Sequence, residues 1–335
     1  MVLGSIWKTA GRFMRRRYAV LNQKSYRTTP IQKLYENLND NLFYLKRDDL
    51  FSFFLGGNKA RKAALFFEDI KKKNCDCVVS YGSSSSNHCR VVANIAAAKS
   101  MPCYLITPTE ASKPTINSKM VQIFGATVRK CPTTEVEKAI ETVLAELKKQ
   151  GHNPYFIPGG GHGDIGTRAY VYAYEEINNY ERKTGIYFDY IFLTSGTGTT
   201  QAGLICGQLI CNDNRTIVGI SNARKNPYGG QVVLESVNSY LDSIGKKHVT
   251  SKNINFVDDY VLGGYGSYNN DILQTIKEIL IRDGIPMDTT YTGKGFWGMK
   301  EYIKEKQITG KNILFIHTGG TPLFFDSLGE LADET

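Results

Sequence analysis

Residues 55 to 62, with the sequence LGGNKARK, place one lysine, Lys59, directly after two glycines and an asparagine. The run that follows, residues 60–73, has the apolar spacing of an amphipathic helix. Lys59 therefore stands at the start of a fixed element, with flexible backbone before it through which a ligand can approach. Taken alone, Lys59 would more often be an ordinary solvated lysine. A role in chemistry depends on the other stretches of the chain.

Beyond Lys59, short apolar strands alternate with helices along the chain. This alternation is typical of parallel sheets joined by right-handed crossovers. The chain of 335 residues is also too long for one typical hydrophobic core. We predict an α/β fold of two three-layer α/β/α domains with mostly parallel sheets. A ligand is expected in the cleft between the domains, at the carboxyl ends of strands.

A glycine cluster at residues 159–163 separates two alternating units. We expect residues 1–52 to form an N-terminal arm and part of the large domain, residues 53–165 a small α/β domain, and residues 166–335 a large α/β domain that binds the ligand. In chain order, we predict strands at residues 42–46, 77–80, 103–107, 127–130, 190–193, 216–220 and 313–317, and helices at residues 60–73, 87–100, 115–124, 135–150, 166–182, 200–211, 231–244 and 271–282.

The net charge of +9 is concentrated at the N-terminus. Residues 1–35 contain eight Lys or Arg and no acidic residue, so subtracting these eight charges leaves +1 for the rest of the chain. A nearly neutral body argues against nucleic-acid binding. We interpret the basic segment as a structural arm, with an organelle-targeting peptide as the minority alternative.

The seven cysteines are an odd number without paired metal-ligand spacing, and no run of 18 apolar residues occurs. We therefore predict no metal site, no membrane contact and reduced thiols in a cytoplasmic protein. Hydrophobic residues make up 41% and charged residues 22% of the chain, which is ordinary for a globular enzyme.

A second glycine-rich stretch, residues 194–203, lies directly after the predicted strand at 190–193 and directly before an apolar helix. Its small residues allow backbone N–H groups to converge, and the helix N-terminus adds partial positive charge, so the turn suits a phosphate group. A tight turn without a ligand is also common. The spacing is neither the Gly-x-Gly-x-x-Gly dinucleotide pattern nor a nucleoside-triphosphate loop, so a monophosphate ligand fits best.

A third polar stretch, residues 80–88, again lies between a predicted strand and a predicted helix. The four consecutive serines at 83–86, together with Asn87, supply hydroxyls, an amide and free N–H groups at a helix start, which suit a carboxylate. Helix capping alone would account for one serine and the asparagine. It does not account for four serines in a row.

Six motifs occur in one order along the chain. They are GGNKxRK at residues 56–62, SNH at 86–88, SGTGT at 195–199, GGYG at 263–266, YTGK at 291–294 and HTGG at 317–320. In this combination, the chain resembles the family of pyridoxal-phosphate enzymes that contains D-cysteine desulfhydrase and 1-aminocyclopropane-1-carboxylate (ACC) deaminase, with a fold like that of tryptophan synthase β. The resemblance covers about residues 28–325.

The resemblance implies that pyridoxal 5'-phosphate (PLP) is the cofactor and lies in the cleft between the two domains. Lys59 would be the lysine that forms a Schiff base with PLP and transfers the proton at the substrate α-carbon. Asn87 would hydrogen-bond the ring hydroxyl of PLP. The phosphate group would be held by four consecutive residues, Thr197, Gly198, Thr199 and Thr200.

On the substrate side, the resemblance implies that Ser86 and the N–H groups of Asn87 and His88 bind the substrate carboxylate. Tyr265 and Tyr291 match two tyrosines that line the substrate side of the site in this family. With the Schiff-base lysine and the carboxylate-binding serine, they form the expected catalytic set. Either tyrosine alone would more often be a packed aromatic.

Thr292 is expected to contact the pyridine nitrogen of PLP. The deaminase pattern has a glutamate at this position, which keeps the nitrogen protonated and strengthens the electron sink, whereas a threonine hydroxyl can donate to an unprotonated nitrogen. The weaker sink favours α-proton removal with prompt loss of a β-substituent. We therefore expect α,β-elimination from a small β-substituted amino acid, as in D-cysteine desulfhydrase, which gives pyruvate, ammonia and sulfide.

Alternatives remain open. A PLP-dependent β-replacement synthase is favoured by the serines at 84 and 85, where family members carry a larger pair, and ACC deaminase activity also stays possible. A non-catalytic protein that binds PLP or another anion would not need the substrate-side residues. The segment 160–164 departs from the Ser-Asn-rich form expected of the family, and we interpret its His162 and Asp164 as an exposed loop pair. The resemblance also implies a homodimer.

Overall fold

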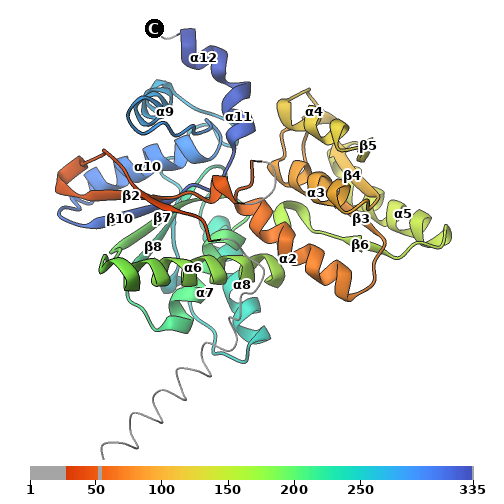
Figure 1. Ribbon diagram of the computed structural model, residues 1–335, viewed down its shortest axis with the longest axis horizontal. Coiled ribbons are helices and arrows are strands. Elements are labelled where there is room, and N and C mark those ends of the chain that lie inside the picture. The colour runs from red at the N-terminus through yellow and green to blue at the C-terminus, as the bar shows by residue number, and fades with distance from the viewer. Residues whose placement is uncertain (1–27, 52–54, 334–335) are drawn as a thin grey trace, which may run out of the picture.

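The computed structural model describes residues 28–51 and 55–333, except for the side chain of Asp333. It has an α/β architecture with two separate sheets, and helices cover both faces of each sheet (Figure 1). The basic arm predicted at the N-terminus falls mainly on residues 1–27, which lie outside the described residues. Two three-layer units match the predicted fold class.

The large unit is built on a six-stranded sheet with the order β1-β2-β10-β7-β8-β9. All neighbouring strands in it are parallel except β1 and β2. Its strands are β1 (Ile31–Lys33), β2 (Leu42–Lys46), β7 (Tyr190–Ser195), β8 (Thr216–Ser221), β9 (Asn255–Val257) and β10 (Asn312–Ile316). Its helices are α6 (Asp164–Thr184), α7 (Thr199–Cys211), α8 (Tyr228–Ser243), α9 (Asn270–Asp283), α10 (Thr292–Glu305), α11 (Thr321–Asp326) and α12 (Leu328–Asp333).

Alternate residues of the central strands enter two different hydrophobic cores. On β7, Ile191 and Leu193 pack with α6, α7 and α8, whereas Phe192 packs with α9 and α10 on the opposite face. Successive side chains of a strand point to opposite faces, and a parallel sheet with helices on both sides buries both sets. The continuous apolar run of this strand is therefore a direct consequence of its central position.

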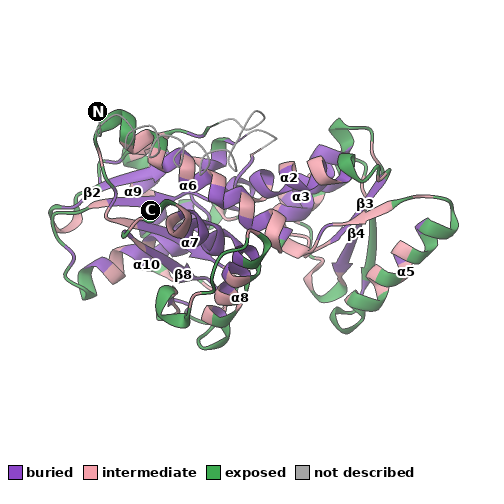
Figure 2. Cartoon of the chain, turned by 90° about the horizontal axis from the view of Figure 1, so that it is seen from below, coloured by how far each residue is buried: buried purple, intermediate pink, exposed green. Residues whose placement is uncertain are grey.

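The small unit has a four-stranded parallel sheet with the order β5-β4-β3-β6. Its strands are β3 (Cys77–Tyr81), β4 (Cys103–Pro108), β5 (Thr127–Cys131) and β6 (Pro154–Phe156), and its helices are α3 (Asn87–Ala98), α4 (Ile116–Ile123) and α5 (Val136–Lys149). One core contains residues of α3 and α4, and a smaller core on the other face contains residues of α5. Figure 2 shows that α5 presents a largely exposed outer face, whereas the central strands β3 and β4 are mostly buried.

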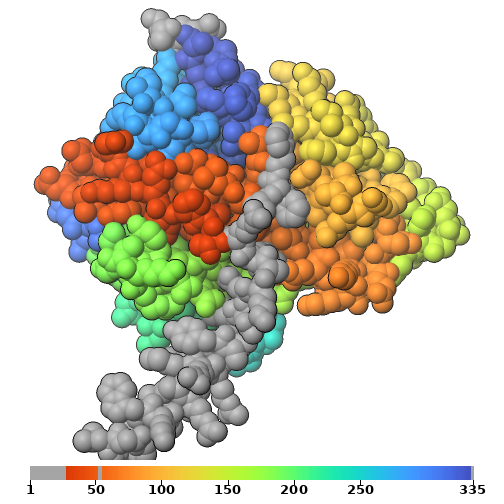
Figure 3. Space-filling view, viewed as in Figure 1, coloured from red at the N-terminus to blue at the C-terminus, as the bar shows by residue number. Residues whose placement is uncertain are grey.

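Helix α2 (Asn58–Lys72), which carries Lys59, lies between the two units and contacts α3 on one side and α6 on the other. Its Arg61 is fully buried and donates hydrogen bonds to Asp48 and Glu176, each at 2.8 Å, and Lys46 donates to Glu176 at 2.7 Å. Two buried cations therefore meet two buried carboxylates. This cluster fixes α2 to the large unit, while its apolar face packs in the core of the small unit. Figure 3 shows the two units side by side.

Three short strands, β1, β6 and β9, and three helices, α10, α11 and α12, were not expected from the sequence pattern. β1, β6 and β9 have three residues each, which is too short for a periodic signal. Helix α10 is interrupted in sequence by Gly293, Gly295 and Gly298, which lower helix propensity. A methyl group at Gly295 would collide with the Thr194 side chain, and one at Gly298 with Ile220, so these glycines let α10 pack closely on the sheet.

Short 3₁₀ helices connect the longer elements at Leu38–Asp40, Asp48–Leu50, Thr109–Ala111, Thr133–Glu135, Gly159–Gly161 and Ser251–Asn253. Helix α6 begins at Asp164, within the predicted junction between the two domains, and the proposed boundary itself stays a prediction. Among the described residues, no helix is both long enough and apolar enough to cross a membrane.

Candidate active site

A cavity of about 220 Å³ lies between the two units. Strands β10, β7 and β8 are neighbours in the large sheet, and the loops that follow them all reach this cavity. Ligand sites of open parallel sheets form at such carboxyl ends. The walls consist of Asn58, Lys59, Asn87, residues 194–198, Thr200, residues 222–224, Tyr265, Tyr291 and residues 318–320.

Lys59 lies at the start of α2 and points its amine into the cavity region, where Nζ donates to the carbonyl oxygen of Gly160 at 3.1 Å. Burial lowers the pKa of this amine to about 8, because the charged form is poorly solvated there. Gly57 adopts a φ of 82°, and a side chain at this position would collide with the Thr318 carbonyl. Gly57 therefore allows the start of α2 to approach the loop after β10 closely, whereas Gly56 allows close approach to the Phe51 carbonyl.

The turn between β7 and α7 opens onto the cavity at the N-terminus of α7. The cavity wall includes Thr197, Gly198 and Thr200. Thr199 is fully buried, is not part of the wall, and hydrogen-bonds His162 at 2.9 Å. Thr200 accepts a hydrogen bond from the amide of Asn58 at 3.1 Å. Three of the four predicted phosphate-binding residues therefore reach the cavity wall.

One buried polar atom at this turn indicates room for an anion. The Ser195 hydroxyl, at the cavity wall, is buried and unpaired within the described part of the chain. Lys62, one helical turn after Lys59 on α2, is not part of the wall, and burial lowers the pKa of its unpaired amine well below the usual value, which favours the neutral form. The Ser195 hydroxyl and the free N–H groups at the N-terminus of α7 can donate to a phosphate group, so the residues present fit PLP.

Asn87, the first residue of α3, lines the cavity and has a fixed orientation. Its side-chain oxygen accepts a hydrogen bond from Asn117 at 3.0 Å, and Asn117 also donates to the Ser85 carbonyl at 2.8 Å. Asn117 is fully buried and was not singled out from the sequence. Because the oxygen of Asn87 is already engaged, its NH₂ group is the part that remains to donate to a ligand.

Ser86 caps α3, since its hydroxyl oxygen accepts from the Cys89 N–H at 3.2 Å, and it does not line the cavity itself. The His88 ring is buried and contacts the Ser80 hydroxyl at 2.9 Å. Ser80 donates its proton to the Ile157 carbonyl, so the ring nitrogen of His88 must be the donor in this pair. Burial, aided by nearby lysine charges, lowers the pKa of His88 to about 3, so this ring stays neutral. The ring does not line the cavity, and its Nδ1 is buried without a partner among the described residues.

The other serines of the 83–86 run serve the turn itself. Ser83 and Ser85 hydrogen-bond each other at 3.0 Å, and Ser84 donates to the Lys113 carbonyl. Neither Ser84 nor Ser85 is among the residues that line the cavity. The serine run is therefore explained by contacts within the small unit. The two serines that favoured β-replacement therefore lie outside the cavity wall.

Tyr265 and Tyr291 come from different segments and meet at the cavity. Their hydroxyl oxygens are 2.7 Å apart, and their rings make an edge-to-face contact with centroids 5.9 Å apart. Tyr291 immediately precedes α10, and Thr194 donates to its carbonyl at 2.8 Å. Burial and the adjacent Tyr265 raise the pKa of Tyr291 well above its usual value, so it stays a neutral phenol.

Thr292 is fully buried and is not part of the cavity wall. Its hydroxyl donates to a carboxylate oxygen of Asp288 at 2.8 Å, and Asp288 also accepts from the N–H groups of Thr290, Tyr291 and Thr292. A hydroxyl has one proton. Donation to the pyridine nitrogen, as expected from the sequence, would require this proton to leave Asp288. The cofactor contact of Thr292 stays a prediction.

Sequence reasoning did not single out Asn222 or Arg224, which follow β8 and line the cavity. Arg224 lies over the Tyr228 ring, with its Cζ 5.3 Å from the centroid, and one of its terminal nitrogens is buried and unpaired among the described residues. Their position in the sequence could have indicated them, because both residues come directly after a predicted parallel strand.

His162 and Asp164 were expected to be a loop pair, but they make different contacts. His162 contacts Thr199, and Asp164 opens α6.

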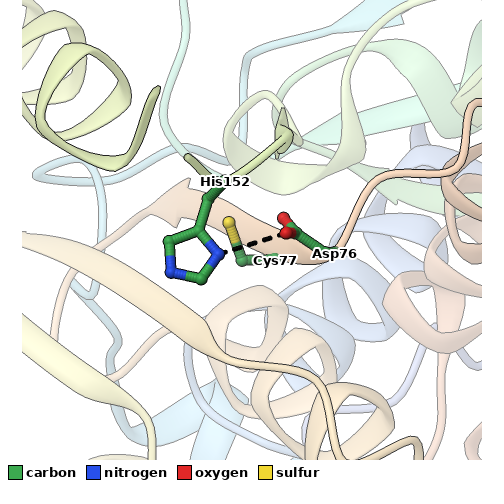
Figure 4. A group of neighbouring side chains, drawn as sticks. All are labelled: Asp76, Cys77 and His152. Carbon is green, nitrogen blue, oxygen red and sulfur yellow. Dashed lines mark hydrogen bonds and ion pairs between the residues drawn. The ribbon is translucent and has the colours of Figure 1, made fainter. Parts of the chain in front are cut away.

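Away from the cavity, the described residues hold one group of three possible metal ligands, Asp76, Cys77 and His152 (Figure 4). His152 contacts Asp76 at 3.1 Å, while the other oxygen of Asp76 accepts from the Asn153 N–H at 2.9 Å. Cys77 is fully buried in the small core. These contacts tie the start of β3 to the loop before β6, and we assign the group no part in the chemistry of the cavity.

The fold and the site, with a lysine and a helix N-terminus meeting in a cleft between two parallel sheets, define a phosphate-cofactor enzyme. A sequence model of the family described as pyridoxal-phosphate dependent enzyme matches residues 23–319. The chain therefore belongs to this family of PLP-dependent enzymes, and PLP is its cofactor.

Known proteins are similar over nearly the whole chain. A putative ACC deaminase of Pyrococcus horikoshii is 33% identical over 302 residues, 87% of this chain and 89% of the relative. A D-cysteine desulfhydrase of Serratia proteamaculans is 29% identical over 313 residues, 89% of this chain and 92% of the relative. The crystal structure of an ACC deaminase homologue superimposes with a TM-score of 0.85 and 31% identity, covering 95% of this chain and 99% of that chain. The processed form of threonine deaminase isoform 2 from Solanum lycopersicum shares the fold, with a TM-score of 0.63, 20% identity, and 92% and 88% coverage.

Proposed function

We propose that this enzyme is a PLP-dependent lyase that removes the α-proton and the β-substituent of a small amino acid, with D-cysteine as the leading substrate and pyruvate, ammonia and sulfide as products. The observation that carries the proposal is the meeting of Lys59, the N-terminus of α7 and the Tyr265–Tyr291 pair in one cavity of about 220 Å³. This cavity is small for a ligand site, which suits a small amino acid beside PLP.

Lys59 and the N-terminus of α3 would have different parts in the reaction. Bound PLP supplies an electron sink for the negative charge left at the α-carbon after proton removal. Lys59, with its pKa lowered to about 8, can both accept and return a proton near neutral pH. The N-terminus of α3, with Asn87 fixed by Asn117, offers N–H groups and partial positive charge to the substrate carboxylate.

The tyrosine pair is suited to protonating a leaving group. Because the two hydroxyls are in contact, one donates to the other and the second proton is free to point into the cavity. The raised pKa of Tyr291 keeps its phenol protonated, so the pair retains both protons. Tyr265 is 54% exposed, so the pair lies where a departing sulfide can reach solvent.

Two observations bear on the choice between elimination and ACC deamination. The cavity wall, as far as the described residues form it, contains no Asp or Glu, so no carboxylate there would keep the pyridine nitrogen protonated. This favours elimination. The relatives named as putative ACC deaminases are 32% and 33% identical to this chain, compared with 29% and 28% for D-cysteine desulfhydrases, which keeps ACC deamination as the second candidate. β-Replacement loses the support that the serines at 84 and 85 gave it.

The test is a panel of D-cysteine, β-chloro-D-alanine, L-cysteine, O-acetyl-L-serine and ACC, followed by release of keto acid and, for the thiols, of sulfide. We expect pyruvate and sulfide from D-cysteine, and no turnover by Lys59→Ala. Keto acid from ACC alone would replace the first candidate by the second. Keto acid from none of the five would refute the lyase proposal.

We also propose a cytoplasmic homodimer. All seven cysteines are unpaired thiols, which suits a reducing compartment. The resemblance to the desulfhydrase and deaminase family supports the dimer. Light scattering on the purified enzyme should give twice the chain mass of 37.4 kDa, and a mass equal to one chain would contradict it.

A further inference from the structure

Lys294, in the first turn of α10, is fully buried and its ammonium group contacts only backbone oxygens among the described residues. Its Nζ donates to the carbonyls of Val261 at 2.8 Å, Gly264 at 2.9 Å and Asn222 at 3.3 Å. An ammonium group has three protons, and three acceptors surround it. No carboxylate of the described residues lies within ion-pair distance of it, so the contact is not a salt bridge.

Each carbonyl belongs to a segment that borders the cavity. Asn222 follows β8 and lines the cavity wall, while Val261 and Gly264 belong to the loop that carries Tyr265. Backbone carbonyls arranged in this way are the ligands that cation sites use. The Lys294 ammonium group therefore occupies the place of a bound cation. It links α10 to the residue after β8 and to residues 261–267, called here the tyrosine loop.

The tyrosine loop has few other fixed contacts. Val261 is buried, but Leu262 and Gly263 are exposed and Tyr265 is 54% exposed, so little packing holds residues 262–265. Within the loop, the Gly264 N–H donates to the Val261 carbonyl at 3.2 Å, and the Ser267 N–H donates to the Gly264 carbonyl at 3.2 Å. Tyr265 follows directly after one of the carbonyls that Lys294 holds. Tyr291, whose hydroxyl contacts that of Tyr265, lies one helical turn before Lys294 at the start of α10.

We propose that Lys294 is a positioning residue, whose ammonium group holds the Val261–Gly264 turn against α10 so that the hydroxyl of Tyr265 meets that of Tyr291 at the cavity. This inference rests on the proposed function in one respect, since it gives the tyrosine pair a part in turnover. The position of the loop itself does not depend on which substrate the enzyme uses.

The first test compares the PLP-loaded variants Lys294→Met and Lys300→Met. Methionine approximates the unbranched four-atom stem of lysine and removes the three donors. Lys300 lies further along α10, pairs with Glu36 and Glu278, and serves as the matched control. We expect Lys294→Met to lower kcat/KM by about 10- to 100-fold through a displaced Tyr265, with PLP affinity changed less than about twofold. Lys300→Met should keep kcat/KM within about twofold. Unchanged turnover in Lys294→Met would overturn the proposal.

The second test asks whether Lys294 acts through Tyr265. In a double-mutant cycle, Lys294→Met should lower kcat/KM by less than about threefold when Tyr265 is already phenylalanine, because the hydroxyl to be positioned is gone. If the two single losses multiply in the double variant, Lys294 does not act through this tyrosine and the proposal fails.

A third measurement is independent of substrate. Amide hydrogen exchange of the holoenzyme should become faster at residues 262–267 in Lys294→Met and stay unchanged there in Lys300→Met. Unchanged exchange would contradict the proposal even if the lyase assignment holds, and faster exchange would support it even if D-cysteine is not the substrate. Should Lys294→Met fail to fold, Lys294→Gln, which keeps two N–H donors, carries the same three measurements with smaller expected effects.

Discussion

At the scale of single residues, Lys59 has an unusual environment for a lysine. Burial lowers its pKa to about 8, whereas a free lysine side chain titrates near 10.4. The neutral amine is the reactive form, so more of it is present at neutral pH than for an exposed lysine.

The pH dependence of Lys59 reactivity follows from this shift. In the PLP-free protein, acylation of Lys59 by a small anhydride should become faster as the pH rises, with a midpoint near pH 8, and level off about one pH unit higher, where the amine is almost fully deprotonated. Mass spectrometry of the peptide that contains Lys59 measures the rate. A rate that keeps rising to about pH 10 would show an ordinary lysine.

Thr292 allows two roles to be separated. In the structure its hydroxyl serves Asp288, so Thr292→Val should lower the free energy of unfolding of the PLP-free protein by about 1–3 kcal/mol through the lost donor. Thr292→Ser keeps the hydroxyl and is the control. Denaturant unfolding measures the loss. Unchanged stability of the PLP-free protein combined with weaker PLP binding would instead favour the contact with the pyridine nitrogen.

At the scale of elements, the anchoring of α2 depends on charge. Burial alone would raise the pKa of Glu176, but the charges of Arg61 and Lys46 outweigh this effect and hold the pKa below its usual value. A lowered folded-state pKa means that the unfolded chain binds the proton first as the pH falls. The cluster therefore contributes stability above the usual carboxylate pKa, and this stability is lost as the pH falls through the folded-state value.

Glu176→Gln removes one buried charge and leaves the two cations only partly compensated. We expect it to lower the free energy of unfolding at neutral pH by about 3–5 kcal/mol. It should also flatten the acid dependence of stability, because one of the shifted carboxylates is gone. Glu175→Gln, at the neighbouring and partly exposed position, is the control and should be close to neutral, since burial raises the pKa of Glu175. Equal losses in both variants would contradict a special role for the cluster.

Local pattern predicted the elements that are long and regular. The β7–α7 turn, α2 and α3 were placed within a few residues, because an apolar period and turn residues mark them in the sequence. Helix α10 was missed because its glycines are explained only by the sheet against which it packs. Contacts between distant segments, such as Asn117 with Asn87 or Lys294 with the tyrosine loop, leave no local signal.

The candidate site shows the same division. Most of the predicted site residues line the cavity: Lys59, Asn87, Thr197, Gly198, Thr200, Tyr265 and Tyr291. The others are not part of its wall: Ser86, His88, Thr199 and Thr292. A motif marks the turn that forms a site, and three-dimensional packing decides which of its side chains face inward.

At the scale of the whole molecule, the two units are not consecutive segments of chain. β1 and β2 come before the small unit, yet they belong to the large sheet. The small unit is therefore inserted after β2, and α2 is the connection that both units share. Movement of one unit relative to the other would act on Lys59 directly, since this lysine lies on the connecting helix.

The position of β10 has a consequence for how the protein is made. This strand, Asn312–Ile316, lies between β2 and β7 in the middle of the large sheet, although it is nearly the last strand-forming stretch to leave the ribosome. The small unit has its complete sheet once β6 has emerged, whereas β2 must wait unpaired on one side for most of synthesis. Exposed strand edges invite association with other chains. Nascent chains that stop before β10 should therefore depend on chaperones, and the timing of its arrival sets when the active site can first form.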